Sequence, residues 1–352
     1  MVGYDGDRNV KDGERSVGKK LSRKPGPKRR IAWPRWTGFG NKTVWDWLQL
    51  LIVPLALVVI GFLFTMQQDA RLQQIEEQRA KREREIENQR AQASALQSYI
   101  DQMSLLLTEE NLSESPEDEV RRVARAHTLT VLGIVEGERK FDVVQFLAEN
   151  ELIQGDDPIV SLRTADLKGA QYKGATGVVA EGERVGEALH NVNLSGTQLD
   201  NANLQSIQLH NARMNEALTY NASLEGANLQ RVSFMNGLIV DTDLSGANLN
   251  GAEFDGAALE NTDLSGASLV GADLSAYLAG TCFIHADLRD ADLEEASQLT
   301  NKQLQQAFGN QNTKLPDAWR RPDAWSKPIE QQRKDKGFDP NYIPIGTNPC
   351  DS

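Results

Sequence analysis

The stretch NTDLSGASLVGADLS, residues 261–275, carries a leucine at every fifth position and a small residue two places before each leucine. A helix repeats every 3.6 residues and a flat strand every two, so a period of five fits neither. A polypeptide with this period must turn a corner after each inward leucine. Four such sides close a coil of twenty residues, and stacked coils pair their backbones at about 4.8 Å.

The period extends well beyond this stretch. Steps of five from Leu189 to Leu274 reach eighteen positions, of which seventeen are apolar and one, Thr219, is polar. A period of twenty appears independently, because TDLSGA occurs at 242–247 and again at 262–267. Inward residues that are twenty apart should therefore stack on one another. We expect Thr219 to point inward as well, and its hydroxyl to bond a neighbouring backbone carbonyl. Two predicted columns are Leu189, Leu209, Leu229, Leu249 and Leu269, and Leu194, Met214, Phe234, Phe254 and Leu274.

The frame slips at two places. Leu162, Leu167 and Tyr172 form an earlier block, after which GVVAEGERVGE (177–187) shifts the frame by two residues. A second slip follows Leu274, because Phe283, Leu288 and Leu293 resume the period one residue early. A bulge or loop should protrude at each slip.

The pattern A(D/N)LxG resembles the pentapeptide repeat family over about residues 160–298. The resemblance implies a mainly β solenoid, a right-handed quadrilateral β-helix. With twenty-four repeats, we expect about six coils and a length of roughly 29 Å.

A solenoid needs its open ends covered, and residues 299–352 supply a capping helix followed by a proline-rich tail. In LTNKQLQQAFG (299–309), Thr300 and Gln303 form a capping box, Leu299 and Leu304 a hydrophobic staple, and Gly309 a helix stop. The segment NTKLPDAW followed by RPDAW resembles the end of many membrane-anchored pentapeptide repeat proteins, and this resemblance implies no molecular activity.

Residues 44–66 are predicted to form a transmembrane helix. Leu48–Met66 are nineteen residues without a charge, enough to span roughly 28 Å. The alternatives are a buried helix and a cleaved signal peptide, but the stretch is long for a signal and no small-x-small cleavage site follows.

Residues 1–43 are predicted to be a disordered basic tail, and they hold twelve Lys/Arg against four Asp/Glu. The positive-inside rule then places the N-terminus in the cytoplasm and the repeats outside it. The tail would contact anionic lipid headgroups, with nucleic acid as the alternative.

Residues 67–110 form a charged helix with heptad-like spacing from Leu72 to Leu107, interrupted by Arg79, Arg82 and Gln89. We expect a coiled coil, and hence a homo-oligomer through residues 67–107, with a lone charged helix as the alternative.

A helical collar follows at 115–153. Its first helix begins with Ser115 as N-cap, and its second covers about Glu138–Glu149. The predicted apolar face of the first consists of Val120, Val123, Ala124, Val131 and Val135. His127 lies near this face and is predicted to be a packing residue.

Few residues are spaced as a catalytic, nucleotide-binding or metal-binding site would require. Gly177–Gly182 have the glycine spacing of a phosphate loop, but Glu183–Arg184 stand where Lys and Ser/Thr are needed. His190 and His210 should stack outward one coil apart, as should Asp243 and Asp263, and we interpret both pairs as surface ladders. The two cysteines, Cys282 and Cys350, support no disulfide framework and no metal site. We therefore predict no catalytic, cofactor-binding or metal-binding residue.

The uneven distribution of charge along the sequence indicates what kind of partner the protein binds. Residues 160–298 hold seven Lys/Arg against nineteen Asp/Glu, and the whole protein has a net charge of −12. We expect a membrane-anchored, non-enzymatic scaffold that presents an acidic β-helix to an unidentified protein partner. One alternative, implied by the resemblance, is a DNA-mimicking protein that binds type II topoisomerases such as gyrase; the anchor and collar argue against it. A second alternative is an accessory of an uncharacterised enzyme.

Overall fold

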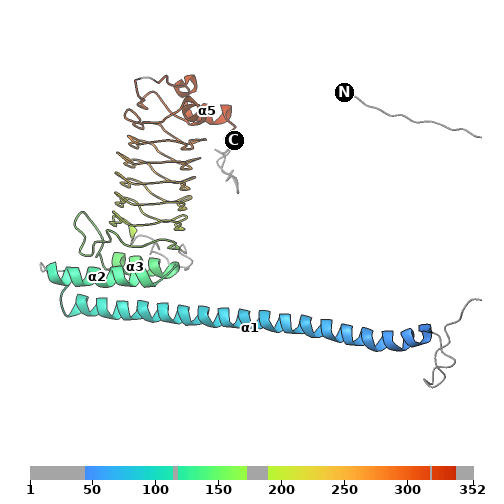
Figure 1. Ribbon diagram of the computed structural model, residues 1–352. Coiled ribbons are helices and arrows are strands. Elements are labelled where there is room, and N and C mark those ends of the chain that lie inside the picture. Colours follow the sequence, from blue (N-terminus) through green and yellow to red (C-terminus); the bar gives the residue numbers. More distant parts are fainter. Residues whose placement is uncertain (1–43, 114–117, 173–188, 318, 338–352) are drawn as a thin grey trace, which may run out of the picture. The chain divides into compact units, whose positions relative to one another are not determined.

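The computed structural model describes residues 44–113, 118–172, 189–317 and 319–337. The protein divides into two compact units, Met1–Arg79 and Ala80–Ser352. Its elements are α1 (Val44–Thr108), α2 (Asp118–Ile134), α3 (Glu138–Glu149), α4 (Asn301–Gln306), the 3₁₀-helix η3 (Asp323–Ser326) and α5 (Ile329–Asp335) (Figure 1).

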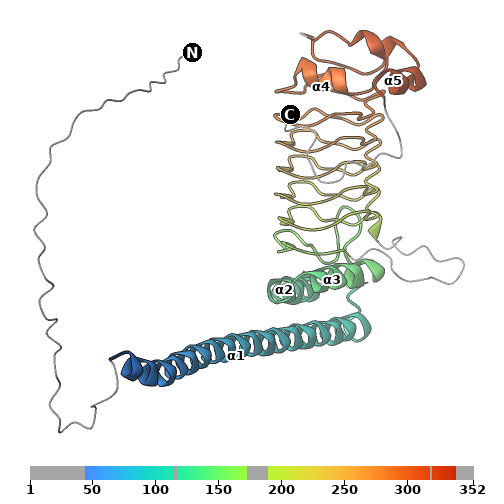
Figure 2. The ribbon, with the colours of Figure 1, turned by 90° about the vertical axis from the view of Figure 1, so that its right-hand side faces the viewer.

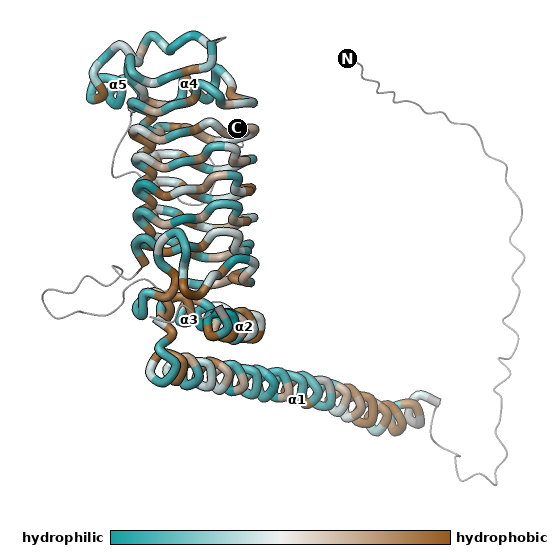
Figure 3. The backbone as a smooth tube through the Cα atoms, turned by 90° about the vertical axis from the view of Figure 1, so that its left-hand side faces the viewer, coloured by the Kyte–Doolittle hydropathy of each residue, from teal (hydrophilic) through white to brown (hydrophobic). Residues whose placement is uncertain are grey.

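The N-terminal part of α1 is strongly apolar (Figure 3). Its large side chains from Leu48 to Met66 are exposed; Leu55 and Val58, for example, are 66% and 68% exposed. The helix continues through Pro54, although a proline removes one backbone hydrogen bond. By length and composition, α1 is the single helix among the described residues that could cross a membrane.

The C-terminal part of α1 packs with α2 and α3, and we call this assembly the collar. Tyr99 and Met103 of α1 are buried. The Tyr99 hydroxyl lies 2.9 Å from the Thr128 hydroxyl of α2. The Tyr99 ring meets the Phe146 ring of α3 edge-on, with centroids 6.1 Å apart. The heptad positions Leu96, Ile100 and Leu107 also pack against this core. The coiled coil therefore stays a prediction, and only earlier positions are free to form it.

The collar helices follow the sequence pattern closely. The bounds of α3 are those predicted. Ala124 and Val131 of α2 and Val135, which directly follows the helix, are buried. Val123 is 40% exposed, so its place on the buried face was predicted wrongly. Ser115, the predicted N-cap, lies outside the described residues.

Beyond the collar, the backbone winds into stacked coils joined by parallel bridges between residues twenty apart, such as Asp243 and Asp263 (Figure 2). Within the described residues the coils pair through isolated bridges rather than longer strands, because each side turns a corner after one bridged residue. The corner residue, two places after the inward leucine, has a positive φ, for example 65° at Gly246 and 54° at Asn261. Glycine and asparagine tolerate this conformation best, which explains the last position of the repeat.

The bridges form four columns, one for each side of the coil. We name each side after its inward residue in one coil: the Leu249, Phe254, Leu259 and Leu264 sides. Each column consists of the outward residues that precede the inward ones. The central members of these columns are Gln208, Asn228, Asn248, Ser268 and Asp287 (Leu249 side); Arg213, Ser233, Glu253, Asp273 and Asp292 (Phe254 side); Gln198, Leu218, Leu238, Ala258 and Tyr277 (Leu259 side); and Asn203, Ser223, Asp243, Asp263 and Cys282 (Leu264 side).

Both predicted frame slips appear in the bridges. Asp166 pairs with Gln198, 32 residues on, which is twelve more than one coil of twenty. Twelve residues are two repeats of five plus two residues, so the five-residue frame shifts by two. Ala258 pairs with Tyr277, nineteen residues on, which is the one-residue slip. The loop expected at the first slip falls largely on residues 173–188, outside the described part of the protein.

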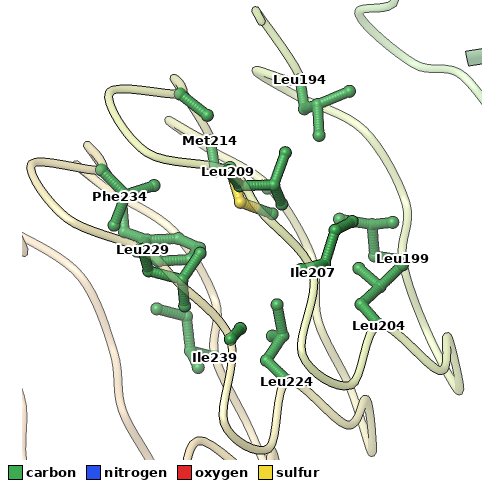
Figure 4. Packing of buried hydrophobic residues seen from close by; sticks show 14 of the residues in the cluster. Leu194, Leu199, Leu204, Ile207, Leu209, Met214, Leu224, Leu229, Phe234 and Ile239 are labelled. Carbon is green, nitrogen blue, oxygen red and sulfur yellow. The ribbon is translucent and has the colours of Figure 1, made fainter. Parts of the chain in front are cut away.

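Inward residues stack like with like, as predicted. All members of the two predicted columns are buried, and Figure 4 shows Leu194, Met214 and Phe234 among their neighbours. The rings of Phe234 and Phe254 stack with centroids 5.3 Å apart. Thr219 is fully buried, which confirms its inward orientation.

The corner between the Leu259 and Leu264 sides is held by threonines. At most corners the inward residue's carbonyl accepts the amide three residues on, as Leu244 accepts from Ala247 at 3.1 Å. The carbonyls of Thr219, Ile239 and Leu259 accept no backbone amide from any described residue. They instead accept hydroxyls from the next coil, donated respectively by Thr242, Thr262 (2.6 Å) and Thr281.

Thr219 itself has a different partner from the one expected. Its hydroxyl lies 3.2 Å from the Thr242 hydroxyl and bonds no backbone carbonyl in the described structure. The Thr242 hydroxyl already donates to the Thr219 carbonyl, so Thr219 is the donor in the hydroxyl pair.

The C-terminal end of the coils is covered by α4, η3 and α5 (Figure 2). The predicted capping box is present, with Thr300 as N-cap and Gln303 as its reciprocal partner. The predicted role of Gly309 was wrong, because α4 ends at Gln306. A Cβ at Gly309 would lie 2.4 Å from the buried Trp325 ring, so this glycine makes room for the tryptophan of the second PDAW segment.

Cys282 corrects another expectation. Its side chain is buried and disulfide-bonded. The sequence contains one other cysteine, Cys350, which lies outside the described residues. The sequence spacing gave no sign that Cys282 is disulfide-bonded.

Candidate interaction surface

The outward Asp or Asn of each repeat builds the corner that follows it. Its side-chain oxygen accepts the amide two residues on: Asp243 accepts from Ser245 at 2.9 Å, and Asn193 accepts from Ser195 at 3.1 Å. Such side-chain turns are typical of Asp and Asn. The same bond is made by Asp166, Asn203, Asp263, Asp273, Asp287 and Asp292. This explains the D/N position of the motif, which sequence reasoning left without a role.

Asp243 and Asp263 stack in adjacent coils, as predicted. Burial raises the pKa of Asp263 above its usual value, and the neighbouring charge of Asp243 raises it further, while the Ser265 amide that it accepts opposes both. Each carboxylate is engaged in its corner. The arrangement is therefore that of two corner-forming residues that carry a charge.

His190 and His210 form the predicted outward ladder. Their rings are nearly parallel, 9° apart, with centroids 5.4 Å apart. The nitrogen lone pairs of an imidazole lie in the ring plane, so two parallel rings do not direct them to one metal ion. Across the described residues, no group of three or more His, Cys, Asp or Glu is placed to hold a metal. The glycine-spaced segment Gly177–Gly182 lies outside that part of the protein, so it stays a prediction that this segment is not a phosphate loop.

Acidic residues gather on two sides of the coils. Glu253, Asp255 and Asp273 lie on the Phe254 side, and Asp243 and Asp263 on the Leu264 side. These two sides are ten residues apart in a coil of twenty, so they face opposite directions. The Leu259 side lies between them.

Several cations near these sides are already paired. Arg213 pairs with Asp156, Arg289 with Asp287, and Lys314 with Asp292 at 2.6 Å. The central coils therefore keep most of their negative charge uncompensated, and that charge attracts basic partners from a distance.

Comparison with protein families shows that residues 188–218 and 240–275 match the model described as "Pentapeptide repeats", in eight copies. Pentapeptide repeats imply a right-handed β-helix, in agreement with the bridged coils. Comparison with curated proteins gave no match.

The solved structures to which this protein is similar include several pentapeptide repeat proteins. One from the cyanobacterium Cyanothece 51142 is 29% identical over 34% of this chain and 63% of its own length, with a TM-score of 0.16. One from the Arabidopsis thaliana thylakoid lumen is 25% identical over 33% of this chain and 77% of its own, with a TM-score of 0.17. HetL from Nostoc sp. strain PCC 7120, involved in heterocyst differentiation regulation, is 22% identical over 44% and 78%, with a TM-score of 0.14.

Proposed function

Because residues 188–218 and 240–275 are pentapeptide repeats, we propose that the protein is a membrane-anchored, non-enzymatic scaffold whose acidic β-helix binds a protein partner. Proteins with these repeats are typically structural or interaction proteins rather than catalysts. The role needs no cofactor.

One observation carries the proposal: aspartate stands where asparagine serves the fold equally well. Asn193 and Asp243 make the same corner bond, so the corner does not require a charge. Burial and like-charge stacking instead make the ionised form of Asp263 less favourable in the folded protein than in the unfolded one, as its raised pKa indicates. The fold therefore does not account for the acidic excess, whereas charge complementarity with a partner does.

The anchor is supported by the exposed apolar part of α1. The basic excess in residues 1–43 favours a cytoplasmic N-terminus and an extracytoplasmic repeat domain. The disulfide at Cys282 supports the same topology, because disulfides persist in oxidising compartments outside the cytoplasm. We further propose that residues 67–107 associate copies of the protein, through the heptad positions that precede the collar.

The test uses the full-length protein in its native membranes. A fourfold variant, Asp243→Asn, Asp263→Asn, Asp273→Asn and Asp292→Asn, keeps every corner oxygen and removes four charges. In vivo cross-linking followed by mass spectrometry should show the partner's yield falling about tenfold or more, which corresponds to about 1.4 kcal/mol of binding. The control is Asn228→Ser with Asn248→Ser, neutral changes in equivalent positions, and it should leave the yield unchanged. Equal yields from the fourfold variant and the wild type would refute the role of the charge.

The acidic excess also fits the alternative of a DNA mimic that binds a topoisomerase. A gyrase supercoiling assay with residues 80–352 separates the two functions. Potent inhibition or protection would favour the mimic, and no effect would favour the scaffold.

A further inference from the structure

The Leu259 side exposes an apolar ladder. From residue 189 to the end of the described part of the protein, the exposed large hydrophobic residues are Tyr220, Leu238 and Tyr277, at 41%, 38% and 40%, and all three lie on this side. Bridges stack Leu218, Leu238, Ala258 and Tyr277 directly above one another. The other three sides show only scattered half-buried apolar residues, namely Met235, Val270 and Ile284.

The fold does not require this ladder. Asn228, Asn248 and Ser268 occupy the equivalent outward position on the Leu249 side. Single exposed apolar residues are ordinary, whereas a contiguous patch marks an interaction site. The backbone here is already paired between coils, since the Leu238 amide donates to the Ala217 carbonyl at 3.0 Å. A partner would therefore bind through side chains and not by adding a strand.

Charge around the ladder indicates what the partner is. Between residues 218 and 279, all of them described, the outward positions of the Leu259 side and its corner with the Leu264 side include Asp241 and Glu260 but no Lys or Arg. The acidic Phe254 and Leu264 sides flank it. Residues 338–352 of the same protein include two Asp and no Lys or Arg, and the repeats of a second copy are acidic. Both of these occupants would add negative charge to negative charge.

We infer that the Leu259 side is a docking face for a protein segment that combines apolar side chains with lysine or arginine. Apolar side chains of the segment would contact Tyr220, Leu238 and Tyr277, and its cations would face the acidic residues on either flank. This inference rests on the proposed scaffold function and names the surface and the partner's chemistry.

The test is site-specific photo-cross-linking of the full-length protein in its native membranes. p-Benzoylphenylalanine replaces Tyr277 in one protein and Asp255, on the acidic Phe254 side, in another. Mass spectrometry then identifies the cross-linked peptide. From position 277 we expect a partner segment that contains both apolar and basic residues.

Two variants decide whether the ladder itself binds. Leu238→Asn, which copies Asn228, should lower the cross-linking yield from position 277 about tenfold, as loss of an interface anchor does. The matched control Val270→Asn, which copies Asn250 on the opposite side, should change it less than twofold. Thermal melts of both variants check that the coils remain folded.

The contrary outcomes are distinct. Cross-links from position 277 to lipid, to residues 338–352 or to a second copy would overturn the inference, as would equal yields from the two variants. A partner captured at position 255 but not at 277 would refute the docking face and leave the scaffold function standing. No partner at either position would refute both.

Discussion

The threonine corner allows one substitution to be compared at two neighbouring sites. Thr219→Val and Thr262→Val each exchange a buried hydroxyl for a methyl group, but the hydroxyls have different roles. That of Thr262 donates to the Ile239 carbonyl at 2.6 Å, which accepts no backbone amide from a described residue. That of Thr219 only contacts the Thr242 hydroxyl, at 3.2 Å.

The expected magnitudes follow from these partners. Thr262→Val leaves a buried carbonyl without a donor, which costs about 1–3 kcal/mol. Thr219→Val removes one neutral hydrogen bond, worth about 0.5–1.5 kcal/mol, and buries a methyl group, worth about 0.8 kcal/mol. The Thr242 hydroxyl keeps its carbonyl acceptors. Thr219→Val should therefore stay within about 0.5 kcal/mol of wild type.

Thermal unfolding of the full-length protein in detergent micelles, followed by circular dichroism, measures the difference. For a unit of this size, 1 kcal/mol corresponds to about 2–4 °C in Tm, so Thr262→Val should melt at least a few degrees below Thr219→Val. Equal melting of the two variants would show that the corner carbonyl does not depend on the hydroxyl. A larger loss for Thr219→Val would mean that the hydroxyl pair, and not the carbonyl bond, holds the corner.

Four further outcomes are expected. Protease added to intact spheroplasts should digest the part of the protein that follows the apolar span; an epitope at the C-terminus that survives until the membrane is breached would reverse the topology. Asp263→Asn should raise the free energy of unfolding at pH 7 by up to about 1 kcal/mol. Because the folded state raises the pKa of this carboxyl, wild type should regain the same stability as the variant when the pH falls to about 3. A difference in stability that persists at that pH would exclude the charge as its cause. Gly309→Ala should displace Trp325 and lower Tm by several degrees, with tryptophan fluorescence shifted to the red; an unchanged spectrum would contradict the close contact. Arg79→Leu with Arg82→Leu should tighten self-association in sedimentation experiments, whereas an unchanged association constant would mean that this seam is unused.

The coils were predictable because their information is local and repeated. Each inward leucine and corner glycine follows from its own five residues, and both frame slips were readable as changes in that period. The bonds between coils were not, since the Thr262 hydroxyl serves a carbonyl 23 residues earlier. A single motif likewise could not show that Gly309 faces Trp325.

The same distinction applies to the candidate surfaces. The stacking of His190 with His210 and of Asp243 with Asp263 followed from the twenty-residue period. The apolar ladder was not recognised, although the twenty-residue period and the one-residue slip place Leu238 and Tyr277 on one side with Tyr220. The five-residue pattern separates inward from outward positions, and it does not show that these three outward side chains are more exposed than Met235, Val270 or Ile284. The seam from Leu96 onward was assigned to another copy of the protein, because its periodicity cannot distinguish a partner helix from the collar.

The bridge columns give the molecule an adjustable length. Backbone bridges join each central coil only to the coil before it and the coil after it, and its outward and inward residues repeat every twenty positions. Duplicating or deleting one whole coil would therefore move the capped end by one step of about 4.8 Å while leaving the collar and the cap unaltered. The reach of the repeats is therefore set in whole coils, and the identical segments 242–247 and 262–267, one coil apart, mark where a coil could be inserted or removed without changing the repeat.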